Sequence, residues 1–162
     1  MANKDQIVGL KPVGKIISLQ EYEAGSVVYP GDLVSMASDG QVDAAAAGTS
    51  AIIGVAMSYA SGAGVKVLVA DSPDQRFVVQ ADDAAIAAQT NLGLNYNITV
   101  GTASTLYKRS AMQLDSSTGA TDSNLPLRAL RLFPQIDNAF GSKVDVEVRI
   151  NNHQLGNKIE GL

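Results

Sequence analysis

A strict two-residue alternation near the C-terminus is the feature that most constrains how this chain folds. Residues 143–150 read Lys-Val-Asp-Val-Glu-Val-Arg-Ile, so charged and apolar side chains alternate without interruption. Successive side chains of a β-strand point to opposite faces of the sheet, and this pattern therefore predicts a strand with one buried and one solvated face. Residues 94–100, Leu-Asn-Tyr-Asn-Ile-Thr-Val, alternate in the same way. Both segments are typical of antiparallel sheets.

Shorter apolar or β-branched runs, separated by turn residues, predict further strands along the chain. These runs are Lys15–Leu19, Ser26–Tyr29, Asp32–Met36, Ile52–Ala56, Val65–Val69, Arg76–Val79, Ala111–Leu114 and Leu127–Phe133. Pro30-Gly31, Asp39-Gly40 and the stretches 61–64, 72–74 and 116–119 are the predicted turns. Strands spaced about 10 residues apart favour an all-β fold, either an antiparallel β-sandwich or a small β-barrel.

One short helix is expected at residues 83–91. Asp82 can accept hydrogen bonds from the free N–H groups of a first helical turn, four alanines favour the helix, and Gly93 can end it. A helix of this length is marginal alone, so it has to pack on the sheets.

The chain has 162 residues, which is the size of one domain. We expect a single β-rich domain over residues 15–153 and a tail over residues 154–162. The apolar residues of 1–14 do not recur with the period of a strand or helix that packs on a core. We therefore interpret this segment either as an N-terminal arm that orders against a partner or as an ordinary edge strand.

The composition excludes several function classes. The sequence has no Cys and one His, so thiolate metal sites, thiol nucleophiles, disulfides and multi-histidine sites within one chain are ruled out. The formal net charge of −4 argues against nucleic acid as a partner. Without a long apolar run or a signal-like N-terminus, we expect no membrane association, and we expect no cofactor and no metal.

Three local motifs lack the context that their chemistry requires. Residues 9–16 match the phosphate-binding pattern G-x-x-x-x-G-K, but Ile16 replaces the required hydroxyl residue. The oxygen-rich stretch 115–122 lacks the ligand spacing of a calcium loop, and we interpret it as a solvated loop. The sequence has no G-x-S-x-G motif that could supply a serine nucleophile for His153 to activate as a base. We interpret His153 as an exposed or strand-capping residue.

Several segments together resemble capsid decoration (cement) proteins of tailed bacteriophages. The first half of the likeness is carried by Val28–Val34, Asp39–Val42, Ile52–Ala56 and Val65–Val69. The second half is carried by Arg76–Asp82, Leu92–Tyr96, Asp137-Asn138 and Val146–His153. The resemblance covers most of residues 25–153 and consists of turn and strand signatures.

The resemblance implies a non-enzymatic virion protein that binds the outer surface of a phage head and reinforces joints between capsid subunits. The implied partner is the major capsid protein, and the protein would be made in the host cytoplasm. A homo-oligomer suits a repeating shell, with a trimer favoured because a three-fold axis repeats one contact. The candidate capsid-contact residues lie in the arm and are Lys4, Ile7, Val8, Leu10 and Lys11.

Three other functions remain open at this point. A carbohydrate-binding β module of a phage tail or surface protein is the main alternative, although the chain has no Trp and only 5% aromatic residues. A small hydrolase would have to use His153 as its base. A major capsid subunit would need a long helix, for which the sequence shows no pattern.

Overall fold

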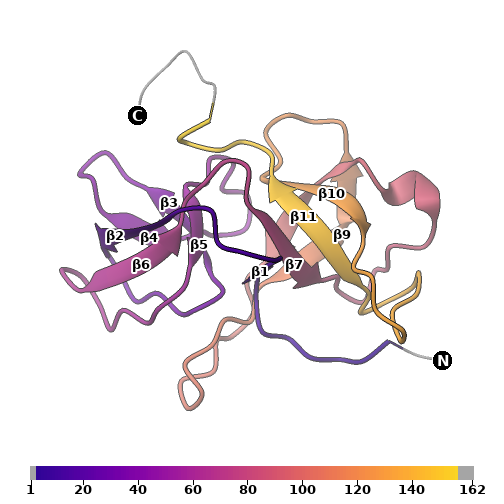
Figure 1. Cartoon of the computed structure of the whole chain (residues 1–162), viewed down its shortest axis with the longest axis horizontal. Helices are drawn as coiled ribbons and strands as arrows, with labels where there is room; N and C mark the ends of the chain where they lie inside the picture. The colour runs from indigo at the N-terminus through magenta and orange to yellow at the C-terminus, as the bar shows by residue number, and fades with distance from the viewer. Residues whose placement is uncertain (1–2, 157–162) are drawn as a thin grey trace.

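Two antiparallel sheets make up nearly all of the computed structural model, which describes residues 3–156 (Figure 1). The six-stranded sheet has the order β1-β7-β11-β10-β8-β9, and the five-stranded sheet has the order β2-β6-β5-β3-β4. The strands are β1 (Lys11–Pro12), β2 (Leu19–Glu23), β3 (Leu33–Met36), β4 (Val42–Ala44), β5 (Gly54–Ala56), β6 (Lys66–Ala70), β7 (Arg76–Gln80), β8 (Asn95–Thr99), β9 (Gln113–Ala120), β10 (Leu127–Leu132) and β11 (Asp145–Ile150).

The all-β fold predicted from the sequence is confirmed. The alternating segment forms β11, which lies between β7 and β10 and buries Val146, Val148 and Ile150. Two packed antiparallel sheets are consistent with a β-sandwich, and within residues 3–156 neither sheet closes into the barrel that was the other expectation.

The middle of the five-stranded sheet is buried on both faces, whereas its edge strand β2 is exposed or half-buried. Leu33 belongs to the core cluster that includes Phe77 of the six-stranded sheet, whereas Val34, the next residue, belongs to a second cluster with Val28. Ala70 and Val69 of β6 divide between the two clusters in the same way. A strand buried on both faces reads as a continuous apolar run, which explains the sequence of residues 52–56.

Three loops cross closely beside the interface of the two sheets. Gly9 and Gly31 both have positive φ angles, of 74° and 94°, and a Cβ on Gly9 would lie 2.5 Å from the Cβ of Ser110. The Leu10 N–H donates to the Gly31 carbonyl at 2.9 Å, and the Ser110 N–H donates to the Pro30 carbonyl at 3.0 Å. Glycine is needed here because the backbones approach within the space of a side chain.

The expected helix at 83–91 is largely wrong. Only a single 3-10 turn, η1 (Gln89–Asn91), is helical. Ala85 has a φ of 73°, which is incompatible with a right-handed helix, and Ile86 is buried in the core with its carbonyl accepting from the Gly141 N–H at 2.8 Å. Burial of Ile86 therefore overrides the helix propensity of the alanines.

Some strand boundaries also differ from those expected. The strand predicted at Lys15–Leu19 begins only at Leu19, and Val28 makes an isolated bridge to Ala60 in place of a strand at Ser26–Tyr29. The predicted turn at 116–119 is part of β9, because a bulge lets the Thr118 hydroxyl accept from the Asn97 N–H at 2.9 Å. Of the expected tail, residues 157–162 lie outside the described residues.

Candidate functional site

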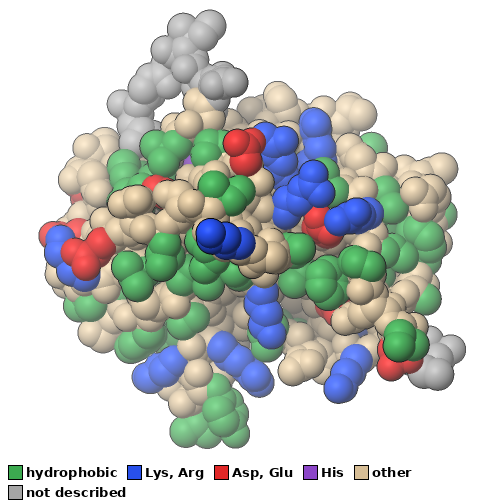
Figure 2. Space-filling view, in the orientation of Figure 1, with side chains coloured by type: hydrophobic (Ala, Val, Ile, Leu, Met, Phe, Trp, Pro, Cys, Tyr) green, Lys and Arg blue, Asp and Glu red, His purple; other side chains and the backbone are tan. Residues whose placement is uncertain are grey.

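Four of the chain's five arginines lie on three adjacent strands of the six-stranded sheet. β7 carries Arg76, β10 carries Arg128 and Arg131, and β11 carries Arg149. In the register of the sheet, Arg128 is opposite Arg149, and Arg149 is opposite Arg76. Figure 2 shows Lys and Arg side chains gathered over this part of the molecule. We call Arg128, Arg149 and Arg76 the arginine row.

A buried carboxylate holds two of the four guanidinium groups. The side chain of Glu147 is 1% exposed, and its Oε1 and Oε2 accept from Arg76 Nη1 at 3.2 Å and from Arg131 Nε at 2.8 Å. Burial raises the pKa of Glu147, but the hydrogen bonds and charges of Arg131 and Arg76 outweigh burial and hold the pKa below its ordinary value. Glu147 is therefore ionised at neutral pH and fixes both arginines.

The other two arginines border a groove of about 550 Å³. Arg149 donates from Nε to the Pro73 carbonyl at 3.2 Å and from Nη2 to Asp74 at 3.4 Å. Arg128 donates from Nε to the side-chain oxygen of Asn95 at 3.0 Å. The groove is lined by Pro73, Asp74, Arg128, Leu130, Arg149, Ile150, Asn151, Asn152, His153, Leu155 and Gly156.

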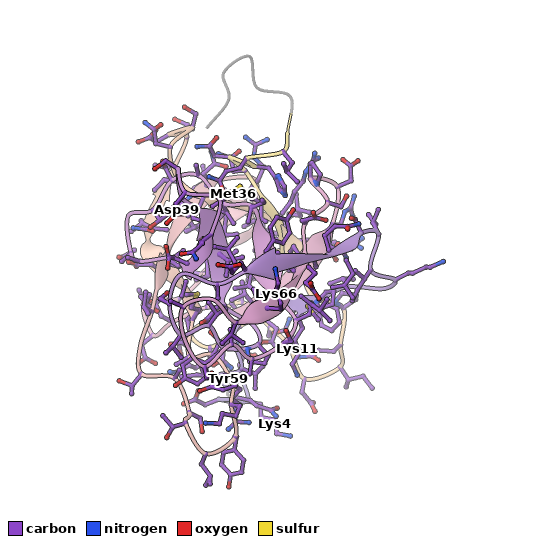
Figure 3. The ribbon with its side chains drawn as sticks, turned by 90° about the vertical axis from the view of Figure 1, so that its left-hand side faces the viewer. Lys4, Lys11, Met36, Asp39, Tyr59 and Lys66 are labelled. Atoms are coloured by element: carbon purple, nitrogen blue, oxygen red, sulfur yellow. The ribbon has the colours of Figure 1, made fainter. Side chains whose placement is uncertain are left out.

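A hairpin at residues 101–110 projects beyond the two sheets, at the bottom of Figure 1. An isolated bridge between Ser104 and Arg109 closes it, and its tip carries Leu106 and Tyr107, which are 79% and 69% exposed. The ammonium group of Lys108 lies 4.6 Å from the ring centroid of Tyr59, which lies at this end of the five-stranded sheet in Figure 3. The hairpin is thus held in place while its apolar tip stays exposed.

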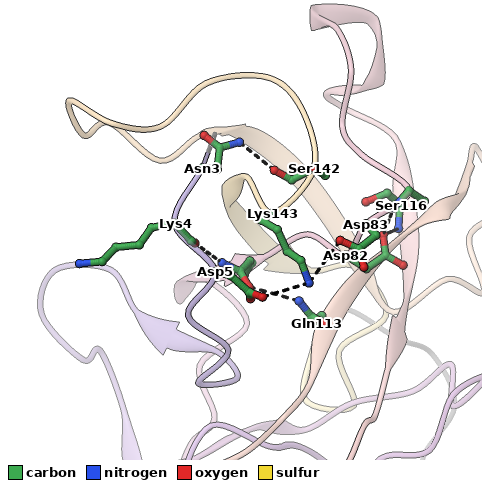
Figure 4. Close-up of polar contacts among 11 residues, drawn as sticks. Asn3, Lys4, Asp5, Asp82, Asp83, Gln113, Ser116, Ser142 and Lys143 are labelled. Carbon is green, nitrogen blue, oxygen red and sulfur yellow. Dashed lines mark hydrogen bonds and ion pairs between the residues drawn. The ribbon is translucent and has the colours of Figure 1, made fainter. Parts of the chain in front are cut away.

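The N-terminal segment folds onto the body of the protein. The side-chain amide of Asn3 donates to the carbonyls of Ala139 and Ser142, and the Asn3 side-chain oxygen accepts from the Ala139 N–H at 3.0 Å. Lys143 lies between Asp5, at 3.6 Å, and Asp83, at 3.4 Å (Figure 4). Of this segment, Lys11–Pro12 forms β1, a two-residue strand at the edge of the six-stranded sheet that pairs with β7.

The five candidate capsid-contact residues are not equally available to a partner. Leu10 is buried in the core, whereas Ile7 is half-buried. Lys4, Val8 and Lys11 line a second groove, of about 710 Å³, together with the exposed Ile136. The contact of these residues with a capsid stays a prediction, but Leu10 already has its partners within this chain.

His153 was expected to be exposed or to cap a strand; it is buried, so the exposed alternative is wrong. It follows β11, makes a parallel bridge to Ile52, and accepts from the Leu155 N–H through Nδ1 at 3.0 Å. The phosphate-loop match at 9–16 leads to β2 with no helix in between among the described residues. Within residues 3–156, no three His, Asp or Glu side chains are grouped so that they could hold a metal ion.

Comparison with known proteins adds no identification. No family model and no curated protein sequence matches this chain. In the part of the chain that the structure describes, no helix is long and apolar enough to cross a membrane. The surfaces themselves, the arginine row and the hairpin tip, are therefore the basis for a functional proposal.

Proposed function

We propose that this protein is a non-enzymatic virion structural protein that binds the outer surface of a tailed-phage head and cements neighbouring capsid subunits. The observation that carries the proposal is the projecting hairpin, which exposes Leu106 and Tyr107 at its tip. The likeness of residues 25–153 to phage decoration proteins supports the same role.

An exposed Leu-Tyr tip is suited to insertion into a recess on another protein. Burying two large apolar side chains contributes about 1.5–3 kcal/mol each when water is displaced, and tyrosine is enriched among the residues that dominate interface energies. The base of the hairpin is tied to the body, because the Ser110 N–H donates to the Pro30 carbonyl, and a loop that is held at its base loses less conformational freedom on binding than a free one.

Attachment to an assembled shell stabilises the shell. A protein that binds the finished lattice more tightly than the free subunits shifts the equilibrium toward the lattice by mass action. If the protein is the homotrimer expected for a three-fold axis, three linked tips increase the effective affinity further. Light scattering of the purified protein measures this oligomeric state.

The test is to look for a major capsid protein gene beside the coding sequence and to measure co-sedimentation with heads assembled from its product. We expect wild-type protein to sediment with the heads and to raise the temperature at which they break. The double variant Leu106→Ser/Tyr107→Ser should bind at least about ten-fold more weakly, since the loss of about 1.4 kcal/mol suffices for that factor. Ile17→Ser is the matched control, because Ile17 is also a large exposed apolar residue but lies outside the hairpin and outside the candidate capsid-contact segment.

Two results would contradict the proposal. One is the absence of a capsid gene near the coding sequence together with no binding to any assembled head. The other is binding to isolated glycans without head binding, which would favour the carbohydrate-binding alternative. Equal binding by the hairpin variant and the Ile17→Ser control would show that the tip is not the contact.

A further inference from the structure

The arginine row places three cations side by side across the sheet. Arg128, Arg149 and Arg76 are register partners on the neighbouring strands β10, β11 and β7. Neighbouring strands lie about 4.8 Å apart, so the row spans roughly 10 Å. Side chains directly opposite on one face of an antiparallel pair interact, and like charges there are unfavourable. The fold thus maintains a repulsive arrangement in a chain whose net charge is −4.

The protein's own carboxylates neutralise only part of this row. Arg76 is paired with the buried Glu147, which it shares with Arg131, and Arg149 is paired with the exposed Asp74. Among residues 3–156, no carboxylate lies within 4.0 Å of Arg128, whose hydrogen bond goes to the neutral amide of Asn95. The guanidinium charge of Arg128, at the end of the row that borders the groove, is therefore not neutralised by a carboxylate of these residues.

The guanidinium groups are also oriented in advance. Each arginine of the row makes at least one hydrogen bond within the chain, through Nε in Arg128 and Arg149 and through Nη1 in Arg76. A guanidinium group has five N–H donors in a rigid fork, so most donors remain for a ligand. Arginines that are already positioned lose less conformational entropy when they bind a carboxylate.

We propose that the arginine row and its adjoining groove are a docking site for an acidic, extended peptide segment of a protein partner. Carboxylates at alternate positions of an extended chain lie on the same side, about 7 Å apart. Two of them fit within the roughly 10 Å row, and arginine forks bind carboxylates through paired hydrogen bonds. The docking site requires a protein partner, but it does not require that partner to be a capsid.

Nucleic acid fits this surface less well. The row offers three arginines in a chain whose net charge is −4, whereas binding to a phosphate backbone depends on many phosphates being neutralised by clustered Lys and Arg. No Phe or Tyr lines the groove on which an unpaired base could stack. The row therefore favours separate carboxylates over a continuous polyanion.

Fluorescence anisotropy with a labelled peptide tests the docking site directly. The probe is fluorescein-labelled Gly-Glu-Ser-Glu-Ser-Glu-Gly, and the control probe has Gln in place of each Glu. We expect the acidic peptide to bind the wild-type protein, with an affinity that falls as salt is added. The variant Arg128→Gln/Arg149→Gln should bind it at least ten-fold more weakly. Arg109→Gln, which removes the one arginine outside the sheet, should bind like the wild type.

The conservative variant Arg128→Lys separates charge from geometry. It keeps the positive charge but loses the fork, so we expect intermediate affinity. Unchanged melting temperatures would confirm that the exposed substitutions leave the fold intact. The docking site is overturned if the Gln peptide binds equally well, if the double variant binds like the wild type, or if a twelve-nucleotide oligothymidine binds more tightly than the peptide. These results leave head attachment through the hairpin untouched, so the two proposals fail independently.

Discussion

Glu147 is a charged residue whose buried position makes stability depend on pH. Its carboxylate accepts from both Arg76 and Arg131. Replacing it by Gln keeps the shape but removes the charge that both guanidinium groups require. We expect Glu147→Gln to lower the free energy of unfolding at pH 7 by about 1.5 kcal/mol, as for a hydrogen bond to a charged group. Urea denaturation measures the change, and the exposed Glu21→Gln is the control.

The direction of the pH dependence follows from the lowered pKa of Glu147. Burial acts to raise this pKa, but the two arginines outweigh it, so the folded state binds a proton less readily than the unfolded chain. The stabilisation is therefore present above the unfolded pKa, about 4.3, and is lost as the pH falls through the lower folded pKa. Wild type and Glu147→Gln should approach each other in stability below that pH. A difference that grows on acidification would contradict this assignment.

At the scale of single elements, β5 depends on a glycine. A Cβ on Gly54 would overlap the Ala70 carbonyl oxygen and would lie 2.7 Å from Cγ1 of Val69, both on the neighbouring strand β6. We expect Gly54→Ala to push the two strands apart and to cost about 3 kcal/mol of stability. Gly62, in the turn before β6, has nothing within 4 Å of its Cβ position. Gly62→Ala should change stability by less than about 0.5 kcal/mol. Equal thermal shifts for the two variants would show that the strands relax freely.

The N-terminal segment is an element of the fold through Leu10. This side chain is buried in the core that contains Phe77, and truncation leaves a cavity. Leu10→Ala should therefore lower the free energy of unfolding by about 2–5 kcal/mol. Deleting residues 1–14 removes the core residue Leu10 together with the arm, so a loss of capsid binding in that variant would not distinguish a lost contact from a weakened fold. Lys4→Gln and Lys11→Gln test capsid contact better, because both lysines are exposed and their substitution should leave the fold stable. Melting temperatures well below that of the wild type would contradict the exposed positions of the two lysines.

The strands were predictable from local pattern, whereas the arginine row was not. Residues 145–150 alternate so regularly that β11 follows from the sequence alone. The row depends on which residues of β7, β10 and β11 stand opposite one another, and register is set by long-range packing. The alternating pattern places Glu147 on the solvated face of its strand, yet the side chains of its arginine partners cover it. The helix predicted around Ile86 is wrong for a similar reason, because the residues that bury Ile86 are distant from it in the sequence.

At the scale of the whole molecule, the two sheets share one core and a connecting segment. Leu33 and Val55 of the five-stranded sheet belong to the same cluster as Phe77 and Val148 of the six-stranded sheet. Directly after β11, Gln154 makes two hydrogen bonds with the Met36 backbone, at 2.8 and 3.0 Å. Met36 lies near the upper end of the five-stranded sheet in Figure 3, opposite the end that carries Tyr59. Contacts of this kind couple the stability of one sheet to that of the other.

We therefore expect the protein to unfold in one cooperative transition. In differential scanning calorimetry, the calorimetric and van't Hoff enthalpies should agree, as they do for two-state domains. Val148→Ala, in the six-stranded sheet, and Val55→Ala, in the five-stranded sheet, should each lower the same single melting temperature. Two separate transitions, with each substitution shifting only one of them, would show that the sheets are independent units. A single transition would show that the hairpin and the strands that carry the arginine row belong to one cooperative unit.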